Sequence, residues 1–200
     1  MNTTLIAATN NPAKLKEMRR ILGELGIEVV TMAEAGLDLH PREDGLTFAE
    51  NARKKAEAVC SASGRPAIAD DSGLCIDALG GSPGIYSARY GGEELDDAAR
   101  TELILGLMKD IPPERRSARF RCAVCVAYPD GRRVEAEGLC EGRVLDRACG
   151  HGGFGYDPIF EDSNGYRFGV VGADVKDSVS HRHHALTALA AKLKGEDPKC

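Results

Sequence analysis

Short apolar segments alternate with helical patterns in the first part of the chain, and this alternation constrains the fold more than any other feature. TLIAAT, residues 4–9, has the pattern of a short strand, and residues 11–25 carry apolar side chains at helical spacing. Asn10 or Asn11 suits the N-cap of that helix. IEVVTM, residues 27–32, predicts a second strand. Strands that interleave with helices predict an α/β fold.

The later part of the chain adds a hairpin to this pattern. Residues 47–63 predict a helix in which Thr47 and Glu50 match a capping box, each side chain accepting from the other residue's backbone N–H. The remaining predicted elements are strands over 67–70, 117–128 and 132–141, and helices over 94–110 and from about 180 to 194. The turn PDG before residue 132 favours a hairpin. A hairpin beside interleaved strands and helices indicates a mixed sheet.

Charge and hydropathy exclude several classes of partner. The 200 residues carry 26 Lys and Arg against 31 Asp and Glu, a net charge of −5, which argues against broad electrostatic binding to nucleic acid. The N-terminal segment lacks the basic stretch and long apolar run of a signal peptide. No segment approaches the roughly 20 apolar residues of a membrane helix. We therefore expect a cytoplasmic protein that binds neither nucleic acid nor membrane.

The seven cysteines form no disulfide or zinc pattern. Cys122 and Cys125 read C-x-x-C, but they lie in the predicted strand 117–128. Residues three apart on a strand point to opposite faces, so these two thiols do not converge on one metal ion. We expect reduced, mostly buried cysteines.

Two adjacent acids, Asp70 and Asp71, close the apolar segment 67–70 and precede Ser72. The carboxyl end of a strand is where open α/β sheets place ligands, and strand alternation sends the two side chains to opposite faces. A carboxylate at such a place favours Mg²⁺ or Mn²⁺, which prefer oxygen ligands. The alternative is a solvated turn, because D-S-G is a common turn composition.

Two further segments carry groups that could bind phosphate or metal. TNNPAK, Thr9 to Lys14, links a strand to a helix, and free N–H groups at a helix start bind phosphate. Glu43 lies in an acidic loop before the helix that carries Lys55, and it could share a metal with Asp71. Ordinary helix capping and a solvated charged surface are the respective alternatives.

The segment GHGGFGYDP, residues 150–158, contains G-x-G-x-x-G without the helix that a dinucleotide site needs. What remains is a glycine-rich loop whose Phe154 and Tyr156 could stack on a nucleobase, or could be buried in a tight turn. Further along, His181 and Arg182 occupy the first turn of a predicted helix, where basic residues oppose the helix dipole. That placement suggests a ligand with acceptor groups.

Five segments occur in order along the chain: TNNPAKLKE, GLTFAENARKKA, AIADDSGLCIDALGGSPGIYSARY, FGYDPIF and SHR. Together they closely resemble the inosine/xanthosine triphosphate pyrophosphatase family, from about residue 5 to residue 194. The resemblance implies an elongated α/β fold with a long mixed sheet flanked by helices. It implies one pyrophosphatase domain, residues 1–200, of two lobes with a central active-site cleft, and a homodimer.

The resemblance also implies an activity and a set of site residues. The activity is Mg²⁺-dependent (or Mn²⁺-dependent) hydrolysis of ITP, dITP and XTP to the monophosphate and pyrophosphate, which removes deaminated purines. By matching motif, Glu43 and Asp71 correspond to metal ligands, Asp71 also to the proton acceptor, and Asp70 to a supporting acid. The implied substrate-binding residues are Thr9, Asn10, Asn11, Lys14, Lys55, Ser72, Phe154, Gly155, Tyr156, Asp157, Lys176, His181 and Arg182. The family often has an acid before the lysine matched to Lys176, where this chain has Val175.

Arg182 offers a simple basis for selectivity, because its guanidinium carries only donors. Inosine and xanthosine present a 6-oxo acceptor, whereas adenine presents a 6-amino donor that would leave both groups unpaired. Two other functions stay open. A nucleotide sensor on the same fold would not need Glu43 and Asp71 together, and a pyrophosphatase for modified pyrimidine or methylated nucleotides would not need the FGYD and SHR segments.

Overall fold

The strands form one mixed sheet in the computed structural model, which describes residues 3–195. The sheet order is β2-β1-β3-β4-β5-β6. The strands are β1 (Thr3–Ala7), β2 (Ile27–Thr31), β3 (Ala67–Ile76), β4 (Ser117–Ala127), β5 (Arg133–Val144) and β6 (Phe160–Asp162). Strand β1 runs parallel to both β2 and β3, whereas β5 and β6 are antiparallel. The predicted mixed α/β sheet is confirmed.

The helices cover this sheet, and most lie where the sequence predicts them. The α-helices are α1 (Pro12–Glu24), α2 (Phe48–Ser63), α3 (Asp97–Leu107), α4 (Ala173–Val179) and α5 (His181–Leu193). Short 3-10 turns are η1 (Asp77–Leu79), η2 (Gly84–Arg89), η3 (Pro113–Arg115) and η4 (Asp157–Ile159). Helix α4 and strand β6 were not predicted. None of the helices within residues 3–195 has the length and apolarity needed to cross a bilayer.

The described chain divides into two compact units, each with its own apolar core. Unit 1 comprises residues 3–71, 122–138 and 182–195, and unit 2 comprises residues 72–121 and 139–181. Strands β3, β4 and β5 contribute residues to both units.

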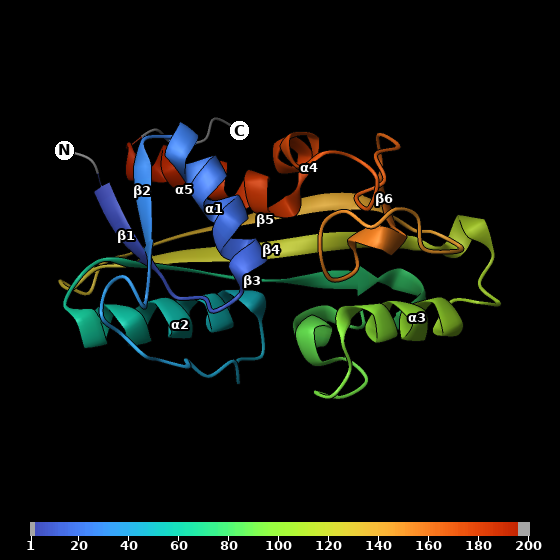
Figure 1. The fold of residues 1–200 in the computed structure, drawn as a ribbon, viewed down its shortest axis with the longest axis horizontal. Coiled ribbons are helices and arrows are strands. Elements are labelled where there is room, and N and C mark those ends of the chain that lie inside the picture. Colours follow the sequence, from blue (N-terminus) through green and yellow to red (C-terminus); the bar gives the residue numbers. More distant parts are fainter. Residues whose placement is uncertain (1–2, 196–200) are drawn as a thin grey trace. The chain divides into compact units, whose positions relative to one another are not determined.

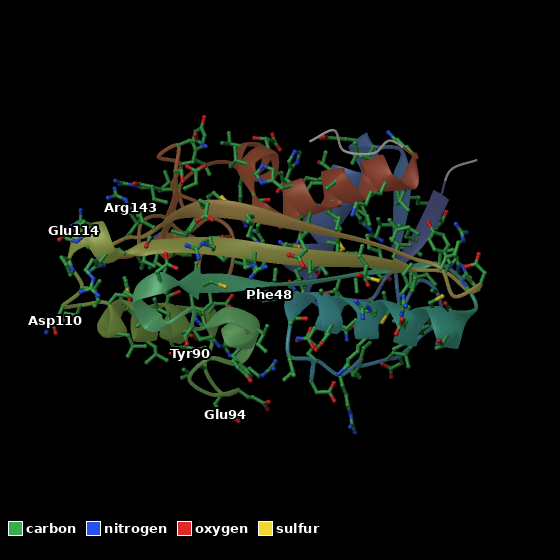
Figure 2. All side chains as sticks on the ribbon, turned by 180° about the vertical axis from the view of Figure 1, so that it is seen from behind. Phe48, Tyr90, Glu94, Asp110, Glu114 and Arg143 are labelled. Atoms are coloured by element: carbon green, nitrogen blue, oxygen red, sulfur yellow. The ribbon has the colours of Figure 1, made fainter. Side chains whose placement is uncertain are left out.

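In unit 1, helices pack on both faces of the strands: α1 and α5 on one face and α2 on the other (Figure 1). The core unites α1, α5 and the strands, and it includes Leu5, Met18, Leu22, Ile68, Val124 and Leu189. Asn11 is the N-cap of α1, as expected for one of the two candidate asparagines. Phe48, labelled in Figure 2, opens α2 and is buried. Burial of such side chains contributes about 1.5–3 kcal/mol each.

In unit 2, the core is rich in aromatic rings. The rings of Phe120 and Phe160 meet edge to face with centroids 4.7 Å apart, and those of Phe160 and Phe168 do so at 5.1 Å. Tyr156 is 5% exposed and donates from its hydroxyl to the Ser87 carbonyl at 2.9 Å. Phe120 of β4, Phe160 of β6, Tyr156 and Phe168 therefore belong to one apolar core.

Strand β3 is the largest departure from the predicted elements. We expected a strand over 67–70 that ends at the two acids, but β3 continues through them to Ile76. Its residues are buried along almost the whole length, including Asp70 and Asp71. The D-S-G composition indicates a turn only when the backbone is free, and here neighbouring strands pair with it. The solvated-turn alternative is therefore wrong.

Other boundaries differ by a few residues. The helix expected over 94–110 is α3, Asp97–Leu107, capped by the Asp96 side chain. The capping box before α2 is only half formed as predicted. Thr47 Oγ1 accepts from the Glu50 N–H at 3.1 Å, but Glu50 Oε2 accepts from the Leu46 N–H at 2.7 Å, one residue earlier than expected. Glu50 thereby fixes the backbone at Leu46, just before the helix begins.

The cysteines are free thiols, as predicted. Cys122 and Cys125 are both buried and unbonded to each other, and Cys200 lies outside the described residues. Cys122 belongs to the core with α1 and α5, whereas the charges of Glu135 and Glu57 raise the pKa of Cys125 in addition to burial. The two thiols therefore lie in different surroundings, which agrees with opposite faces of β4.

Candidate functional site

The charged groups of unit 1 gather beyond the carboxyl end of β1. Strands β2 and β3 lie on opposite sides of β1, an arrangement in which α/β sheets bind ligands outside the carboxyl ends of the strands. β1 ends at Ala7, and its neighbour β3 continues to Asp70 and Asp71. The segment that follows β1 leads directly into α1, which carries Lys14. Sheet topology therefore brings two of the predicted segments together.

Asp70 is fully buried and surrounded by positive charge. Lys14 Nζ lies 3.2 Å from Asp70 Oδ2, and Arg182 donates to the same oxygen from Nη2 at 2.8 Å. Burial by itself raises the pKa of Asp70, but the charges of Lys14 and Arg182 outweigh it and hold the pKa well below its ordinary value. Asp70 is therefore held in its charged form between Lys14 and Arg182.

Asp71 points the other way along the alternation of β3, toward α2. Its Oδ2 accepts a hydrogen bond from Asn51 Nδ2 at 2.9 Å, and its side chain is almost completely buried. Burial raises the pKa of Asp71 above its ordinary value, and the nearby negative charge of Glu43 adds to this, although Lys55 opposes it. A carboxylate with a raised pKa, placed on β3 beyond the carboxyl end of the neighbouring strand β1, is suited to accept a proton.

Glu43 and Lys55 form an ion pair beside Asp71. Lys55 Nζ donates to Glu43 Oε1 at 2.5 Å. Burial opposes ionisation of both groups, but the positive charge of Lys55 lowers the pKa of Glu43, and the charges of Asp70 and Glu43 raise that of Lys55. Both groups are therefore held in their charged forms.

The donor set around Asp71 fits a hard divalent cation. Glu43 and Asp71 offer carboxylate oxygens, and the charge of Glu43 is close enough to raise the pKa of Asp71. Within residues 3–195 no group of three or more His, Cys, Asp or Glu side chains is placed to hold a metal ion. Mg²⁺ is commonly held by one or two carboxylates, with substrate phosphates and water as its other ligands. Two carboxylates are consistent with that mode of binding and not with a closed zinc site.

The segment before α1 is ordered by its own side chains. Thr9 Oγ1 accepts from the Asn11 N–H at 3.1 Å, and Asn11 Oδ1 accepts from the N–H groups of Ala13 and Lys14 at 2.9 and 3.1 Å. Asn10 contacts the Leu39 carbonyl at 3.3 Å through Nδ2. The expectation of free N–H groups at this helix start is wrong for Ala13 and Lys14, because the cap already uses them. A phosphate here would be met by side chains, above all by Lys14.

Arg182 belongs to unit 1 and is almost completely buried. Its Nε and Nη2 donate to Asp70 Oδ2 at 3.2 and 2.8 Å, and Nη1 donates to Glu17 on α1. Glu17 is itself buried. The structure thus gives Arg182 the role of joining α5 to α1 and β3. Its contact with a purine 6-oxo group stays a prediction.

In unit 2, Phe154, Asp157 and Lys176 lie together. Lys176 Nζ donates to Asp157 Oδ2 at 2.5 Å, and the Phe154 N–H donates to the same oxygen at 2.8 Å. The Lys176 ammonium also lies 4.6 Å from the centre of the Phe154 ring, within the range of a cation–π contact. Lys176 is buried although Val175 precedes it. Lys176 therefore lies next to the aromatic loop even though Val175 stands where the family often has an acidic residue.

The other predicted substrate-binding residues of unit 2 differ in their burial and in their contacts. Gly155 donates its N–H to Asp97 Oδ2 at 2.8 Å, and Ser72 follows Asp71 on β3. The His181 ring stacks on Phe120 at 4.7 Å and is buried. Tyr156 belongs to the core, so its predicted stacking on a base is wrong in this arrangement and the buried-aromatic alternative holds. Phe154 is the half-buried aromatic of this loop.

Sequence reasoning missed Asn51, Glu17 and Asp97. Asn51 lies four residues before Lys55, on the same helical face, so its position was the available signal for a role beside Asp71. Glu17 lies on the apolar face of α1, where a charged residue requires a partner. No local pattern marks Asp97, because its contact with Gly155 joins residues 58 positions apart.

The chain is similar to known proteins over most of its length. A Ham1 family profile matches residues 5–192. The dITP/XTP pyrophosphatase of Bacillus subtilis is 47% identical over 191 residues, which cover 94% of this chain and 96% of the relative, and that of Desulforamulus reducens is 47% identical over 184 residues, 91% of each chain. The solved Ham1 protein of Staphylococcus aureus superimposes with a TM-score of 0.85 at 36% identity, covering 98% of this chain and 100% of that one. The chain belongs to the Ham1 family.

Proposed function

We propose that this protein hydrolyses non-standard purine nucleoside triphosphates, namely ITP, dITP and XTP, to the monophosphate and pyrophosphate. The observation that carries the proposal is the group of charged side chains in unit 1: the ion pair of Lys55 with Glu43, the buried Asp71 whose pKa both charges affect, and the ion pair of Lys14 with Asp70. Relatives named dITP/XTP pyrophosphatase, at 43–47% identity over most of the chain, support the substrate class. In the cell, the reaction would remove deaminated purines from the nucleotide pool.

The cations of unit 1 would bind the triphosphate. Lys14 is partly exposed and lies against Asp70, and Lys55 lies against Glu43. Both would complement the negative charge of the phosphate oxygens. Thr9, Asn10 and Asn11 lie in the same segment as Lys14 and would also contact the triphosphate. Glu43 and Asp71 would hold Mg²⁺ or Mn²⁺, which when bound would neutralise charge on the phosphate oxygens.

Asp71 would act as the general base. It would accept a proton from a water molecule while the water oxygen forms a bond to the α-phosphorus. The bond from the α-phosphorus to the bridging oxygen breaks, and pyrophosphate leaves with the electron pair. Burial raises the pKa of Asp71, which strengthens it as a base. Ser72 is not needed as a nucleophile and would contact the substrate.

Residues of unit 2 would recognise the purine. Phe154 offers a half-buried ring in the loop that continues through Gly155 to Asp157, and Lys176 beside it carries only donors. Donors suit the 6-oxo group of inosine and xanthosine and not the 6-amino group of adenine. His181 and Arg182, at the start of α5, stay candidates for the same task.

Product analysis tests the proposed function. Purified protein with Mg²⁺ would be given ITP, dITP, XTP, GTP, ATP and CTP in parallel, and the products would be separated by ion-exchange chromatography. We expect monophosphate and pyrophosphate from the first three, and persistence of GTP, ATP and CTP. Binding of ITP without turnover would instead support a sensor, and turnover of CTP would support a pyrimidine enzyme.

We also propose that the chain acts as one catalytic domain and as a homodimer in the cytoplasm. The support is the resemblance over residues 5–194 and the contribution of β3, β4 and β5 to both compact units. Light scattering coupled to size-exclusion chromatography would give about twice the chain mass of 21.3 kDa for a dimer. A mass equal to one chain at micromolar concentration would contradict the dimer.

A further inference from the structure

Asn51 connects three parts of the unit 1 site. Its Nδ2 donates to Asp71 Oδ2 at 2.9 Å, and its Oδ1 accepts from the Gly45 N–H at 2.7 Å. The side chain has no exposed surface. Gly45 is two residues from Glu43, so one amide group joins β3, α2 and the loop that carries the second predicted metal ligand.

The chemistry of the partners fixes the orientation of this amide. The Gly45 N–H can only donate, so the atom that faces it must be the carbonyl oxygen of Asn51. The amide nitrogen then faces Asp71, where it meets an acceptor. Asn51 is satisfied on both sides only in this orientation, and an acid at this position would turn an acceptor toward Asp71.

The loop approaches Asn51 too closely for any residue other than glycine at position 45. A Cβ built on Gly45 would lie 2.7 Å from Asn51 Oδ1 and 2.9 Å from the Glu50 Cβ. Gly45 is itself buried. The loop backbone therefore packs directly against the Asn51 amide, and the hydrogen bond links this amide to the loop that carries Glu43.

We propose that Asn51 is a positioning residue that holds Asp71 and the Glu43 loop in one fixed geometry for the reaction. The inference rests on the proposed function for its catalytic consequence and on the two hydrogen bonds for its structural part. Packing alone does not require an amide here, because the neighbouring buried positions of α2, Ala52, Ala56 and Val59, are apolar. An unpaired buried amide would be costly, so its two bonds account for its presence.

Two variants separate the contacts of Asn51. Asn51→Ala removes both, and we expect kcat on ITP to fall about 10–100-fold, the usual cost of losing a residue that orients a metal ligand. The KM for ITP should stay within about threefold, because Asn51 is not placed to touch the substrate. Asn51→Asp keeps an acceptor for the Gly45 N–H but sets a carboxylate against Asp71, and its kcat should fall at least as far as that of Asn51→Ala.

Two readouts do not depend on turnover. Hydrogen exchange at the Gly45 amide should quicken in Asn51→Ala and stay slow in Asn51→Asp. Binding of Mn²⁺ alone, followed by electron paramagnetic resonance, should weaken about 10–100-fold in Asn51→Ala.

Lys54→Met is the matched control. It breaks the exposed 2.8 Å ion pair between Lys54 and Asp44, which ties the same loop to the same helix without touching Asp71. We expect wild-type kcat and Mn²⁺ affinity for this variant. The proposal would be overturned by a wild-type kcat in Asn51→Asp, or by equal losses in Asn51→Ala and Lys54→Met. If wild-type protein turns over no nucleotide, the proposed function fails, while Gly45 exchange and Mn²⁺ binding still decide whether Asn51 positions the site.

Discussion

Charged side chains in unit 1 alternate in sign from one contact to the next. Lys14 meets Asp70, Asp70 meets Arg182, and Arg182 meets Glu17. Isolated buried charges would be strongly unfavourable, and alternation makes each one tolerable. The exception is Asp71, whose pKa is raised by burial despite Lys55. A carboxyl group that is costly to keep ionised is an expected feature of a reactive site.

Asp71→Asn should therefore separate activity from stability. The amide keeps an acceptor for Asn51 and removes a buried negative charge, so we expect the melting temperature to be unchanged or higher. Loss of the general base should lower kcat about 10²–10⁴-fold. Thermal unfolding and ITP kinetics on the same preparation check both parts. A large drop in melting temperature would show that Asp71 is needed for the fold instead.

Arg182→Met should mainly destabilise the protein. It leaves the buried carboxylates of Asp70 and Glu17 without their shared partner, a change that usually costs about 3–5 kcal/mol of unfolding free energy. Urea denaturation measures this loss. Arg167→Met is the control, because Arg167 is half-exposed in its ion pair, and it should cost about 1 kcal/mol or less.

Kinetics on the folded Arg182 variant address its second predicted role. Reading of the 6-oxo group requires kcat/KM to fall far more for ITP than for ATP. Equal losses on both nucleotides would limit Arg182 to joining α5, α1 and β3. The stability result stands in either case.

At the scale of elements, the site depends on strand β3 and helix α2, which direct particular side chains toward one another. Strand β3 sends Asp70 toward α1 and α5, and sends Asp71 toward α2. Helix α2 carries Asn51 and Lys55 one turn apart, so both face the part of β3 that holds Asp71. Sequence periodicity predicts both elements, but the length of β3 depends on pairing with distant strands, which no local pattern reveals.

Strand β6 in unit 2 gives a pH-dependent prediction. Glu161 accepts hydrogen bonds from Arg167 at 2.8 Å and from Arg143, labelled in Figure 2, at 2.6 Å. The bond from Arg167, followed by that from Arg143, outweighs burial and holds the pKa of Glu161 below its ordinary value of 4.5. Because the folded pKa is the lower one, the stabilisation is present above the ordinary value and is lost as pH falls through the folded value.

Glu161→Gln should accordingly lower the melting temperature at pH 7 and have progressively less effect as the pH falls below about 4. Thermal unfolding of wild type and variant between pH 3 and 7 measures the difference. Glu93→Gln, at an exposed position of the same unit, is the control and should show no such difference. A gap that widens toward acid would contradict the ion pairs around Glu161.

At the scale of the whole molecule, cysteine reactivity reports on both cores. Burial raises the pKa of Cys122, Cys125 and Cys140 to about 12. At pH 8 these thiols are almost entirely protonated, so iodoacetamide should not label them in the native protein. Cys75 and Cys149 are partly exposed, and burial raises the pKa of Cys75, so Cys149 should react first among the described thiols. Peptide mapping before and after denaturation checks this, and native labelling of Cys122 or a disulfide to Cys125 would contradict it.

The sequence predicts much of the molecule because local and global preferences agree in most elements. Helices α1 and α2 combine apolar periodicity with capping residues, and the hairpin of β4 and β5 has a suitable turn. Helix α4 was missed because it is short and lacks a side-chain cap. Likewise, the burial of Tyr156 and Arg182 depends on partners far along the chain, such as Ser87 and Asp70. Motifs therefore identify candidate site residues, whereas the partners that those residues contact can be known only from the folded structure.

Hydrolysis of ITP in H₂¹⁸O tests the central claim most directly. If water attacks the α-phosphorus with Asp71 as the base, mass spectrometry should find ¹⁸O in the inosine monophosphate and none in the pyrophosphate. The Asp71→Asn variant should lose this labelled product while it keeps its fold. Label in the pyrophosphate would place the attack on the β-phosphorus, and label in orthophosphate would place it on the γ-phosphorus. Either result would contradict the reaction assigned to Asp71.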